Sequence, residues 1–474
     1  MNSNMQNLSG QTVTAKSGKS YYLTDIVGSG AQGVVYKEKT EKYMVKFYFP
    51  NNTSQFDKDI LEKLSFIKNV KKPKNFVEIL DLIDTPYIGY VMEKVIEHTP
   101  LNTYLIPDHT KNFSEWYHSG LGFRERLFIG HIIAKAFTAL SEDNLSYCDI
   151  SGNNILVKVK DNIISVRMID IDNIYIAGNG ISTVLGTPRY IAPEIISGTR
   201  NPDVFSDNYS LAVILFELLR IGHPYVSAEI EDGTLEDENE AYAGKTDYVT
   251  PDEPNMIPEE IAFTDRLRDL FKRCFIEGKE NRMERPSAKE FEFALLDASN
   301  KVIKCPFCGV WHYPRKEKQY LCPWCDKESR PSAYLTFYDK FFDVNSNIYT
   351  PHKEDKKALS TYFLRDGKNI IYSSYALRTV NSSEAGWGNK NESFVTIVKN
   401  SSGYHVYNEF IKDDIYIKKF LSGTIIKVEF KKEELLASGD EIFFDAPDKK
   451  NSIVGDKDKE YKIIRTAIFV EDKR

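Results

Sequence analysis

Two short segments with acidic and amide side chains constrain this chain more than any other part of its sequence. The first, Tyr147–Val157, contains Asp149 and Asn154 ahead of an apolar run. The second, Met168–Asp172, contains Asp170 among apolar residues. Carboxylate and amide oxygens beside strands are suited to holding magnesium against a polyphosphate, and a carboxylate can also accept a proton from a hydroxyl. We therefore expect Asp149 to act as a base, and Asn154 and Asp170 to bind magnesium.

A glycine-rich segment lies near the start of the chain, between two runs that have the composition of β-strands. Glycines allow the backbone to approach phosphates without a side-chain clash and to present N–H groups to the anion. A dinucleotide-binding turn would lead into a helix, so the strand-like flanks favour a hairpin that covers a nucleotide. A glycine-rich structural hairpin without a ligand is the alternative. The residues expected at the nucleotide are Gly28, Ser29, Gly30, Gly33 and Val35.

A lysine, Lys46, lies inside the otherwise apolar strand predicted at Tyr43–Phe47. Burying an ammonium group is costly unless an anion meets it. Nucleotide phosphates and a carboxylate from a helix would both serve. We expect the carboxylate to come from a helix at Phe56–Lys68, with Glu62 favoured and Asp59 as the alternative. A lysine that reaches solvent from an edge strand is the remaining possibility.

The run Tyr87–Val95 begins as a β-strand and then becomes polar. Further along, apolar residues recur with a helical period from Phe123 to Leu145, which predicts the helix that leads into the catalytic segment.

Together these segments resemble the eukaryotic-type (Hanks-type) bacterial protein kinases. More narrowly, they resemble kinases with a C-terminal zinc ribbon from tellurite-resistance-associated kinase, phosphatase and von Willebrand A systems. The resemblance covers roughly residues 21–298 and continues through Leu185–Glu194, Ser206–Val213 and Arg285–Ala288. It implies an α+β bilobal kinase fold and an ATP- and magnesium-dependent serine/threonine protein kinase. Such an enzyme transfers the γ-phosphate to a protein hydroxyl and can phosphorylate itself.

The catalytic set that the resemblance implies is Asp149, Lys46, Glu62, Asn154 and Asp170, and Arg285 would pair with Glu194. In the protein kinases that this chain resembles, the strand at the place of Tyr87–Val95 enters the hinge between the lobes, which implies that Met92 lies behind a bound adenine and that the backbones of Glu93 and Val95 hydrogen-bond to it.

Three positions depart from that family. Tyr147–Cys148 replaces the usual His-Arg pair, so the loop lacks the arginine that would bind an activation-loop phosphate. Ser151 stands where serine/threonine kinases usually carry a lysine that contacts the γ-phosphate, and Asp172 replaces the glycine of the metal-binding loop. A pseudokinase that acts as a nucleotide-sensing scaffold and a small-molecule kinase are therefore alternatives. Candidate autophosphorylation sites are Ser182, Thr183 and Thr187.

Four cysteines, Cys305, Cys308, Cys322 and Cys325, form two Cys-Pro-aromatic-Cys pairs. In a large chain without an export signal, such pairs favour metal over disulfides. Four thiolates can hold tetrahedral zinc with no open position, which predicts a structural zinc ribbon. A segment this short can bury little apolar surface. Structural zinc contributes roughly 10–16 kcal/mol to the folding of small domains, so we expect bound zinc to order this segment. A site in which His312 replaces one cysteine, a rubredoxin-type iron site and paired disulfides are the alternatives.

Short β-type runs alternate with polar turns near the C-terminus, which predicts an all-β sandwich-like domain. Its Leu435–Phe444 segment looks like the closing strands of a forkhead-associated domain. We identify no Gly-Arg and Ser-x-x-His set of the kind that reads phosphothreonine, and Arg378 is the nearest arginine candidate. A plain interaction or structural sandwich is therefore favoured. The predicted strands are Tyr334–Phe337, Ser393–Val398, Tyr404–Tyr407, Thr424–Val428 and Glu441–Phe444.

The chain has 474 residues with 42% hydrophobic residues and a formal net charge of −7, which argues against a broad basic surface for nucleic acid. No apolar segment follows a basic start, so we expect no secretory signal, and the longest apolar run is too short to cross a bilayer. We expect a cytoplasmic protein that acts on a protein substrate and binds neither nucleic acid nor membrane. The resemblance adds a metal-dependent phosphatase and a von Willebrand A protein as partners. The expected parts are a polar extension (1–20), a kinase domain (21–300; small lobe about 21–92, large lobe about 96–300), a zinc ribbon (301–328) and a β-rich domain (331–474).

Overall fold

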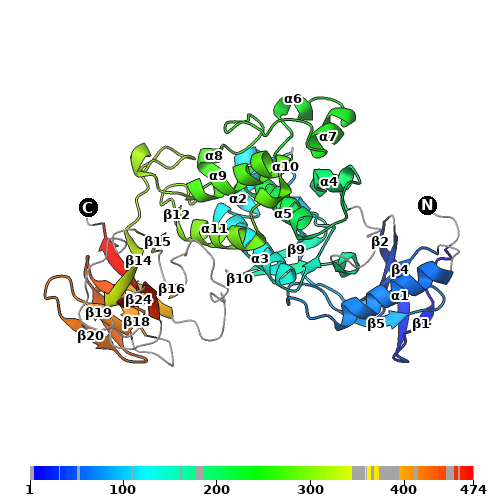
Figure 1. Ribbon diagram of the computed structural model, residues 1–474, viewed down its shortest axis with the longest axis horizontal. Helices are drawn as coiled ribbons and strands as arrows, with labels where there is room; N and C mark the ends of the chain where they lie inside the picture. The colour runs from blue at the N-terminus through cyan, green and yellow to red at the C-terminus, as the bar shows by residue number, and fades with distance from the viewer. Residues whose placement is uncertain are drawn as a thin grey trace. The chain divides into compact units, whose positions relative to one another are not determined.

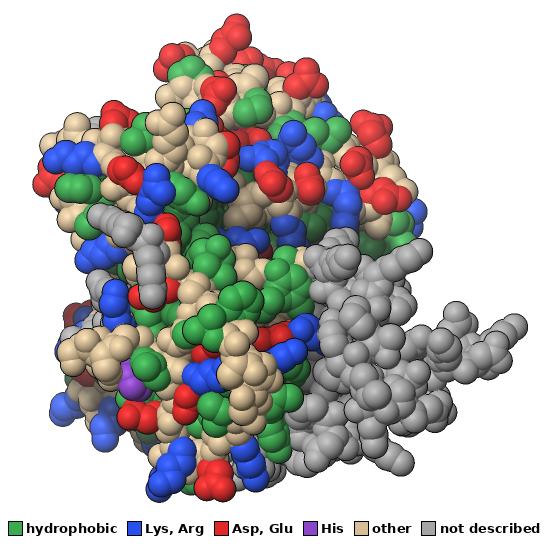
Figure 2. All heavy atoms as spheres, turned by 90° about the vertical axis from the view of Figure 1, so that its left-hand side faces the viewer, with side chains coloured by type: hydrophobic (Ala, Val, Ile, Leu, Met, Phe, Trp, Pro, Cys, Tyr) green, Lys and Arg blue, Asp and Glu red, His purple; other side chains and the backbone are tan. Residues whose placement is uncertain are grey.

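The computed structural model describes residues 5–30, 32–50, 54–108, 110–160, 163–176, 186–343, 358, 360–364, 368–372, 394–408, 415–444, 453–456 and 459–472 (Figure 1). The chain divides into two compact units: residues 1–121 with 128–292, and residues 122–127 with 293–474. Among the described residues, no helix is both long and apolar enough to cross a membrane. On the face drawn in Figure 2, acidic side chains predominate along the upper edge, and acidic and basic side chains are interspersed below it.

The first unit begins with a six-stranded antiparallel sheet in the order β1-β2-β3-β4-β6-β5. Helix α1 (Ser54–Asn69) follows β4 and packs on β5, as predicted for the segment around Phe56–Lys68. The strands are β1 (Thr12–Thr14), β2 (Ser20–Ser29), β3 (Gly33–Glu38), β4 (Tyr43–Tyr48), β5 (Ile79–Ile83) and β6 (Gly89–Glu93).

Residues assigned to the polar N-terminal extension form part of this sheet. Strand β1 pairs with β2, placing Thr12 opposite Tyr22. Leu8 and Val13 are buried in the same apolar cluster as Val45 of β4. Two apolar side chains in a mostly polar segment are enough to anchor it, because each buried aliphatic side chain contributes roughly 1.5–3 kcal/mol.

The rest of the first unit is mainly helical. A three-stranded sheet, β10-β9-β7, and a two-stranded sheet, β11-β8, lie next to the catalytic segment in the chain. These strands are β7 (Thr99–Pro100), β8 (Leu145–Ser146), β9 (Ile155–Lys160), β10 (Ile163–Met168) and β11 (Tyr175–Ile176). The helices are α2 (Phe113–Ser119), α3 (Phe123–Glu142), α4 (Pro193–Ile196), α5 (Val204–Arg220), α6 (Ala228–Glu231), α7 (Leu235–Tyr242), α8 (Glu259–Ala262), α9 (Asp265–Lys272), α10 (Gly278–Glu280) and α11 (Ala288–Asn300), whose last residues belong to the second unit.

Helix α5 forms the buried centre of this helical part. It begins at a capping box, in which the Asp203 carboxylate accepts hydrogen bonds from the backbone N–H groups of Phe205 and Ser206. Such a cap satisfies donors that the first helical turn leaves free. Nearly all of its residues are buried, including the charged side chains of Asp207 and Glu217. The Asp207 carboxylate holds the catalytic segment, as described below, and the Glu217 carboxylate accepts hydrogen bonds from Arg189 Nε and the Tyr190 hydroxyl.

The second unit contains a small hairpin and two larger sheets. The hairpin pairs β12 (Ile303–Lys304) with β13 (Trp311–His312). One large sheet has the order β15-β14-β24-β22-β19-β20, with β23 beside β24, and the other has the order β16-β17-β18-β21. The strands are β14 (Ala333–Asp343), β15 (Ser360–Phe363), β16 (Lys368–Tyr372), β17 (Phe394–Asn400), β18 (Gly403–Tyr407), β19 (Ile415–Lys418), β20 (Ile425–Val428), β21 (Glu433–Leu436), β22 (Glu441–Phe443), β23 (Ile453–Asp456) and β24 (Lys459–Glu471).

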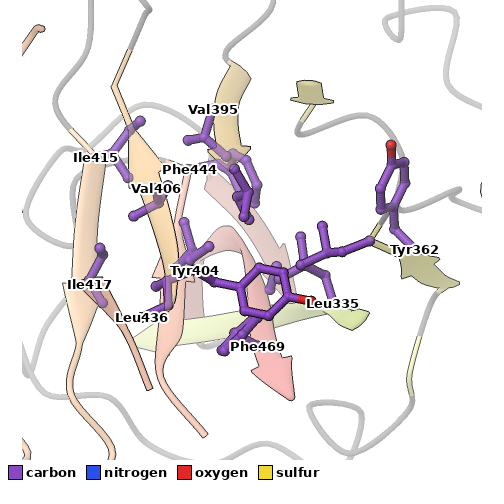
Figure 3. Packing of buried hydrophobic residues seen from close by; sticks show 14 of the residues in the cluster. Leu335, Tyr362, Val395, Tyr404, Val406, Ile415, Ile417, Leu436, Phe444 and Phe469 are labelled. Carbon is purple, nitrogen blue, oxygen red and sulfur yellow. The ribbon is translucent and has the colours of Figure 1, made fainter. Parts of the chain in front are cut away.

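Both large sheets contribute side chains to one apolar core. Leu335 and Phe469 come from the first sheet and Val406 and Leu436 from the second, and all four are buried together (Figure 3). The C-terminal part is therefore a β-sandwich, and the predicted strands lie in β14, β17, β18, β20 and β22 as far as the structure describes them. Sequence analysis did not predict β24, whose pairing with β14 is the longest in the sheet.

Candidate active site

Lys46 is the buried cation of the site, with 7% of its surface exposed. Its Nζ lies 2.9 Å and 3.1 Å from the two carboxylate oxygens of Asp172 and 3.4 Å from Asp170 Oδ1. Burial alone would lower the pKa of Lys46, but the carboxylates of Asp172 and Asp170 outweigh it and raise the pKa. The side chain is therefore held as an ammonium ion within the apolar sheet.

The predicted ion pair between Lys46 and a carboxylate of α1 does not form. Glu62 is exposed, and so is Asp59, which accepts a hydrogen bond from Gln55. The helix instead directs Lys63 inward. Burial lowers the pKa of Lys63, and the opposing effect of the Asp172 carboxylate does not outweigh it. The expectation erred by one helical position, because successive residues point about 100° apart around a helix.

Asp170 and Asp172 lie at the end of β10 and differ in their surroundings. Asp170 has a left-handed backbone with φ of 56°, a conformation uncommon for residues other than glycine that recurs at functional sites. Burial raises its pKa, as does the neighbouring Asp172 carboxylate, against the opposing effect of Lys46. Burial would also raise the pKa of Asp172, but Lys46 and the hydroxyls of Tyr48 and Tyr90 lower it below its ordinary value.

Asp149 is held by three polar side chains from different parts of the chain. Its Oδ1 accepts a hydrogen bond from Thr187 Oγ1 at 2.9 Å. Its Oδ2 accepts from Asn173 Nδ2 at 3.2 Å and from Asn154 Nδ2 at 3.3 Å. Asn154 Nδ2 also donates to the Asp149 backbone carbonyl at 3.0 Å. The carboxylate is thus fixed in orientation by Asn173, which sequence analysis did not assign, and by Thr187, which it named only as a candidate autophosphorylation site.

The backbone that presents Asp149 is fastened to helix α5. The N–H groups of Tyr147 and Cys148 donate to the Asp207 carboxylate at 2.6 Å and 3.1 Å. Burial raises the pKa of Asp207 to about 7, against the lowering effect of these two donors. Gly186 closes over the same loop with φ of +83°, and a β-carbon there would lie 2.8 Å from the Cys148 carbonyl oxygen. Glycine is therefore required at this position.

Ser151, which replaces a lysine of the related family, is buried and accepts a hydrogen bond from the Asn154 backbone at 3.3 Å. It therefore caps the turn between Asp149 and Asn154. The predicted pair of Glu194 and Arg285 is confirmed, with two contacts of 2.7 Å and 2.8 Å. Of the candidate phosphorylation sites, Ser182 and Thr183 lie outside the described residues.

These residues surround a cavity of about 1130 Å³. The glycine-rich segment covers it, and the β-carbon of any other residue at Gly33 would lie 2.0 Å from the Phe47 carbonyl oxygen. The cavity is also lined by Leu156 and Ile169, apolar residues that sequence analysis did not assign. The predicted site residues that line it are Gly28, Ser29, Gly30, Gly33, Val35, Lys46, Met92, Glu93, Val95, Asp149, Asn154 and Asp170.

The residues expected to bind magnesium fit that ion. Asn154 and Asp170 both line the cavity, and their carboxamide and carboxylate oxygens are hard ligands of the kind that Mg²⁺ prefers. Within the described part of the chain, neither Asn154 Oδ1 nor Asp170 Oδ2 accepts a hydrogen bond. Both oxygens are therefore available to a cation.

The four cysteines of the second unit lie in one cluster, with their sulfur atoms within 4.8 Å of one another. Cys305 and Cys325 are 3.7 Å apart, and so are Cys308 and Cys322. A tetrahedron with Zn–S bonds of about 2.3 Å has edges of about 3.8 Å, and a disulfide measures about 2.05 Å. The spacing therefore fits four thiolates around zinc and excludes paired disulfides.

The two cysteine turns have the same backbone hydrogen bonds. The N–H of Gly309 donates to the Cys305 carbonyl, and the N–H of Asp326 donates to the Cys322 carbonyl, both at 2.9 Å. His312 is not part of the cysteine cluster. Its ring nitrogens lie 3.0 Å from the Tyr313 carbonyl oxygen and 2.9 Å from Ser329 Oγ.

The β-sandwich contains one spacing that sequence analysis overlooked. Ser402 and His405 form a Ser-x-x-His set at the start of β18, with Ser402 Oγ 2.7 Å from His405 Nε2. The Ser-x-x-His half of the phosphothreonine-reading set is therefore present, whereas the sequence contains no Gly-Arg pair to complete it. Arg378, the arginine candidate for this domain, lies outside the described residues.

A glycine-rich segment, a buried lysine, a fixed carboxylate and two available oxygen ligands thus surround one cavity of the first unit. The family model of the protein kinase domain matches residues 21–293. Myosin light chain kinase A of Dictyostelium discoideum is 26% identical over 208 residues, which is 42% of this chain and 66% of the relative. Serine/threonine-protein kinase AtPK2/AtPK19 of Arabidopsis thaliana is 27% identical over 219 residues, 44% of this chain and 43% of the relative.

Serine/threonine-protein kinase unc-51 of Caenorhabditis elegans is 24% identical over 290 residues, 58% of this chain and 31% of the relative. This chain therefore covers less than two thirds of the length of each of these curated relatives. The chain belongs to the protein kinase family, because the family model spans more than half of it.

Proposed function

We propose that this protein is an ATP- and magnesium-dependent serine/threonine protein kinase that transfers the γ-phosphate to a protein hydroxyl. The observation that carries the proposal is the convergence of Lys46, Asp149 and Asp170 on one cavity beneath the glycine-rich segment. A cavity of about 1130 Å³ is large enough for a nucleotide, since small-molecule sites span roughly 300–1,000 Å³.

In this proposal each side chain has a defined task. Lys46 neutralises nucleotide phosphates, and the backbone of Gly28 and Gly30 covers them. Asn154 and Asp170 hold magnesium, which when bound neutralises charge on the phosphate oxygens. Asp149 orients the acceptor hydroxyl and accepts its proton as the oxygen attacks the γ-phosphorus.

Phosphate transfer by the purified protein is the deciding measurement. With radiolabelled ATP and a panel of protein substrates, Asp149→Ala should lower labelling by about 100-fold or more, the range for removing a catalytic base. Its affinity for ATP should change little, because Asp149 does not hold the nucleotide. Asp143→Asn, an acidic residue exposed at the end of α3, is the matched control and should keep full activity.

The replacement of the catalytic-loop lysine by Ser151 and of the preceding arginine by Cys148 favours two other outcomes. Wild-type protein that binds ATP but labels neither itself nor any protein would support a nucleotide-sensing scaffold. Labelling of small molecules alone would support a small-molecule kinase. Labelling of the chain itself would place autophosphorylation sites, which mass spectrometry would locate.

We also propose that the cysteine cluster holds one structural zinc ion and that the β-sandwich is forkhead-associated-like. The sulfur spacing of 3.7 Å supports the zinc site. The contact between Ser402 Oγ and His405 Nε2 supports the forkhead-associated-like assignment. A metal-dependent phosphatase, a von Willebrand A protein and a tellurite-resistance system are proposed as context from the sequence resemblance alone.

A further inference from the structure

Asp172 does not line the cavity itself, but its buried carboxylate is fully hydrogen-bonded and contacts Lys46, which does line it. Its Oδ1 accepts from Lys46 Nζ at 3.1 Å and from the Tyr90 hydroxyl at 2.9 Å. Its Oδ2 accepts from Lys46 Nζ at 2.9 Å and from the Tyr48 hydroxyl. Its side chain is 1% exposed. A buried carboxylate that accepts four hydrogen bonds from three donor groups is held in one position, because moving it would leave its charge unpaired.

This arrangement separates the tasks of the two aspartates. Both oxygens of Asp172 are occupied by protein donors, so no lone pair is directed at a metal. Asp170, with 30% of its side chain exposed, lines the cavity and engages only Oδ1 with Lys46 among the described residues. The two aspartates of the Asp-x-Asp sequence therefore differ in role: Asp170 can bind a metal, whereas Asp172 anchors a lysine.

The β-sheet explains why the anchor is rigid. Tyr90 of β6 lies directly opposite Lys46 of β4, and Tyr48 is two residues further along β4. Alternate residues of a strand share a face, and so do residues paired across strands. The two tyrosines thus flank the lysine on one face of the sheet and bind the same carboxylate that binds it.

Helix α1 does not share this task. Glu62 is exposed, and the residue that turns inward is the cation Lys63, which attracts Asp172 and repels Lys46. In protein kinases generally, a glutamate of the corresponding helix must pair with the strand lysine. A cation at this place leaves Lys46 without a helix partner.

We propose that Asp172 is the positioning residue that holds Lys46 toward the nucleotide phosphates, in place of the helix glutamate of other protein kinases. This inference rests on the proposed function and assigns its lysine anchor. The sheet and the metal-binding loop then determine the position of the Lys46 ammonium group, independently of where helix α1 lies. Without Asp172, the nearest carboxylate to Lys46 is Asp170 at 3.4 Å, so the lysine would compete with magnesium for that residue.

The test compares Asp172→Asn, Glu62→Gln and Lys46→Met, with the double variant Lys46→Met/Asp172→Asn and the matched control Asp143→Asn. Steady-state kinetics gives kcat and KM for ATP, and calorimetry gives Kd for ATP and for adenosine. Asp172→Asn should lower kcat/KM by about 50-fold or more and weaken ATP binding, with adenosine binding within about twofold of wild type. Glu62→Gln and Asp143→Asn should lie within about twofold of wild type in every measurement.

The double variant decides whether Asp172 acts through Lys46. Residues that act as a unit are non-additive, so Asp172→Asn should lower activity by no more than about threefold when Lys46 is already methionine. A purely structural role would weaken adenosine and ATP alike and would multiply with Lys46→Met. Either result, or a loss in Glu62→Gln equal to that in Asp172→Asn, would overturn the inference.

Failure of the proposed function has a different signature, since wild-type protein would then transfer no phosphate. In that case the same four variants are compared by their affinities for ATP and adenosine alone. A selective, Lys46-dependent loss of ATP binding in Asp172→Asn would still support the anchor, and its absence would refute it.

Discussion

At the scale of single residues, the site contains three carboxylates that differ in their hydrogen bonds and in their exposure. Asp149 accepts three hydrogen bonds from three side chains, Asp172 is buried and accepts four from three side chains, and Asp170 keeps an oxygen available at the cavity. Hydrogen bonding and exposure, rather than residue type, distinguish the proposed base, the proposed anchor and the proposed metal ligand. Much of this could be predicted, because Asp149, Asn154 and Asp170 lie close together in the chain.

Thr187 provides the first residue-scale prediction. Thr187→Val removes the 2.9 Å hydrogen bond to Asp149 Oδ1 and leaves the carboxylate less well oriented. We expect kcat to fall by about tenfold, with KM for ATP nearly unchanged, because base orientation affects the chemical step more than nucleotide binding. Steady-state kinetics measures both. Thr187→Ser, which keeps the hydroxyl, should retain most of the activity, and equal losses in the two variants would contradict the assignment.

At the scale of elements, α4 and the segment before α11 are joined by the Glu194 and Arg285 pair. Helix α4 has only four residues and could not persist alone, since isolated helices shorter than about 12 residues are marginal in water. Two contacts of 2.7 Å and 2.8 Å fix it to the helical part of the first unit. A long-range ion pair thus replaces the local stability that the helix lacks.

This pair predicts a dependence of stability on pH. Burial alone would raise the pKa of Glu194, but Arg285 outweighs it and lowers the pKa below the ordinary value of 4.5. A carboxylate with a lowered folded pKa stabilises the protein above pH 4.5 and loses that contribution as the pH falls through the folded pKa. Glu194→Gln should therefore cost about 3 kcal/mol in the free energy of unfolding near pH 7.

Urea unfolding at several pH values checks this expectation. The difference between wild type and Glu194→Gln should shrink below pH 4.5, where protonation makes Glu194 resemble glutamine. Glu236→Gln, a change at an exposed glutamate of α7, is the control and should show a much smaller difference. If the difference in the free energy of unfolding stayed constant down to acid pH, the charge of Glu194 would not be what stabilises helix α4.

At the scale of the whole molecule, the chain consists of two compact units with different sources of order. The first has an extensive helical core and the nucleotide cavity, whereas the second combines a β-sandwich with a ribbon that has little core of its own. Binding energy adds to the stability of the unit that binds. Nucleotide and metal should therefore act on separate unfolding events.

Calorimetry on the full chain tests this division. Mg-ATP at about 100 times its Kd should stabilise the transition of the first unit by about 2.7 kcal/mol.

Metal analysis should find one zinc per chain, and Cys305→Ser with Cys325→Ser should remove it, because structural zinc needs its four thiolates. That variant should expose the ribbon to proteolysis while ATP still shifts the first transition. Absence of zinc from the wild type would reject the metal site.

Local spacing was enough to predict the glycine-rich cover, the Asp149 and Asn154 loop, the cysteine cluster and several strands of the sandwich. In each case the residues that act together are near neighbours in the chain or repeat a simple pattern, so the sequence itself holds them close. The partner of Lys46 and the donors to Asp149 were decided only by the tertiary structure. A helix turns about 100° per residue, so a pattern could not distinguish an inward Glu62 from an inward Lys63. Contacts such as that of Thr187 with Asp149, or of β14 with β24, depend on how distant segments pack, and no local pattern determines that packing.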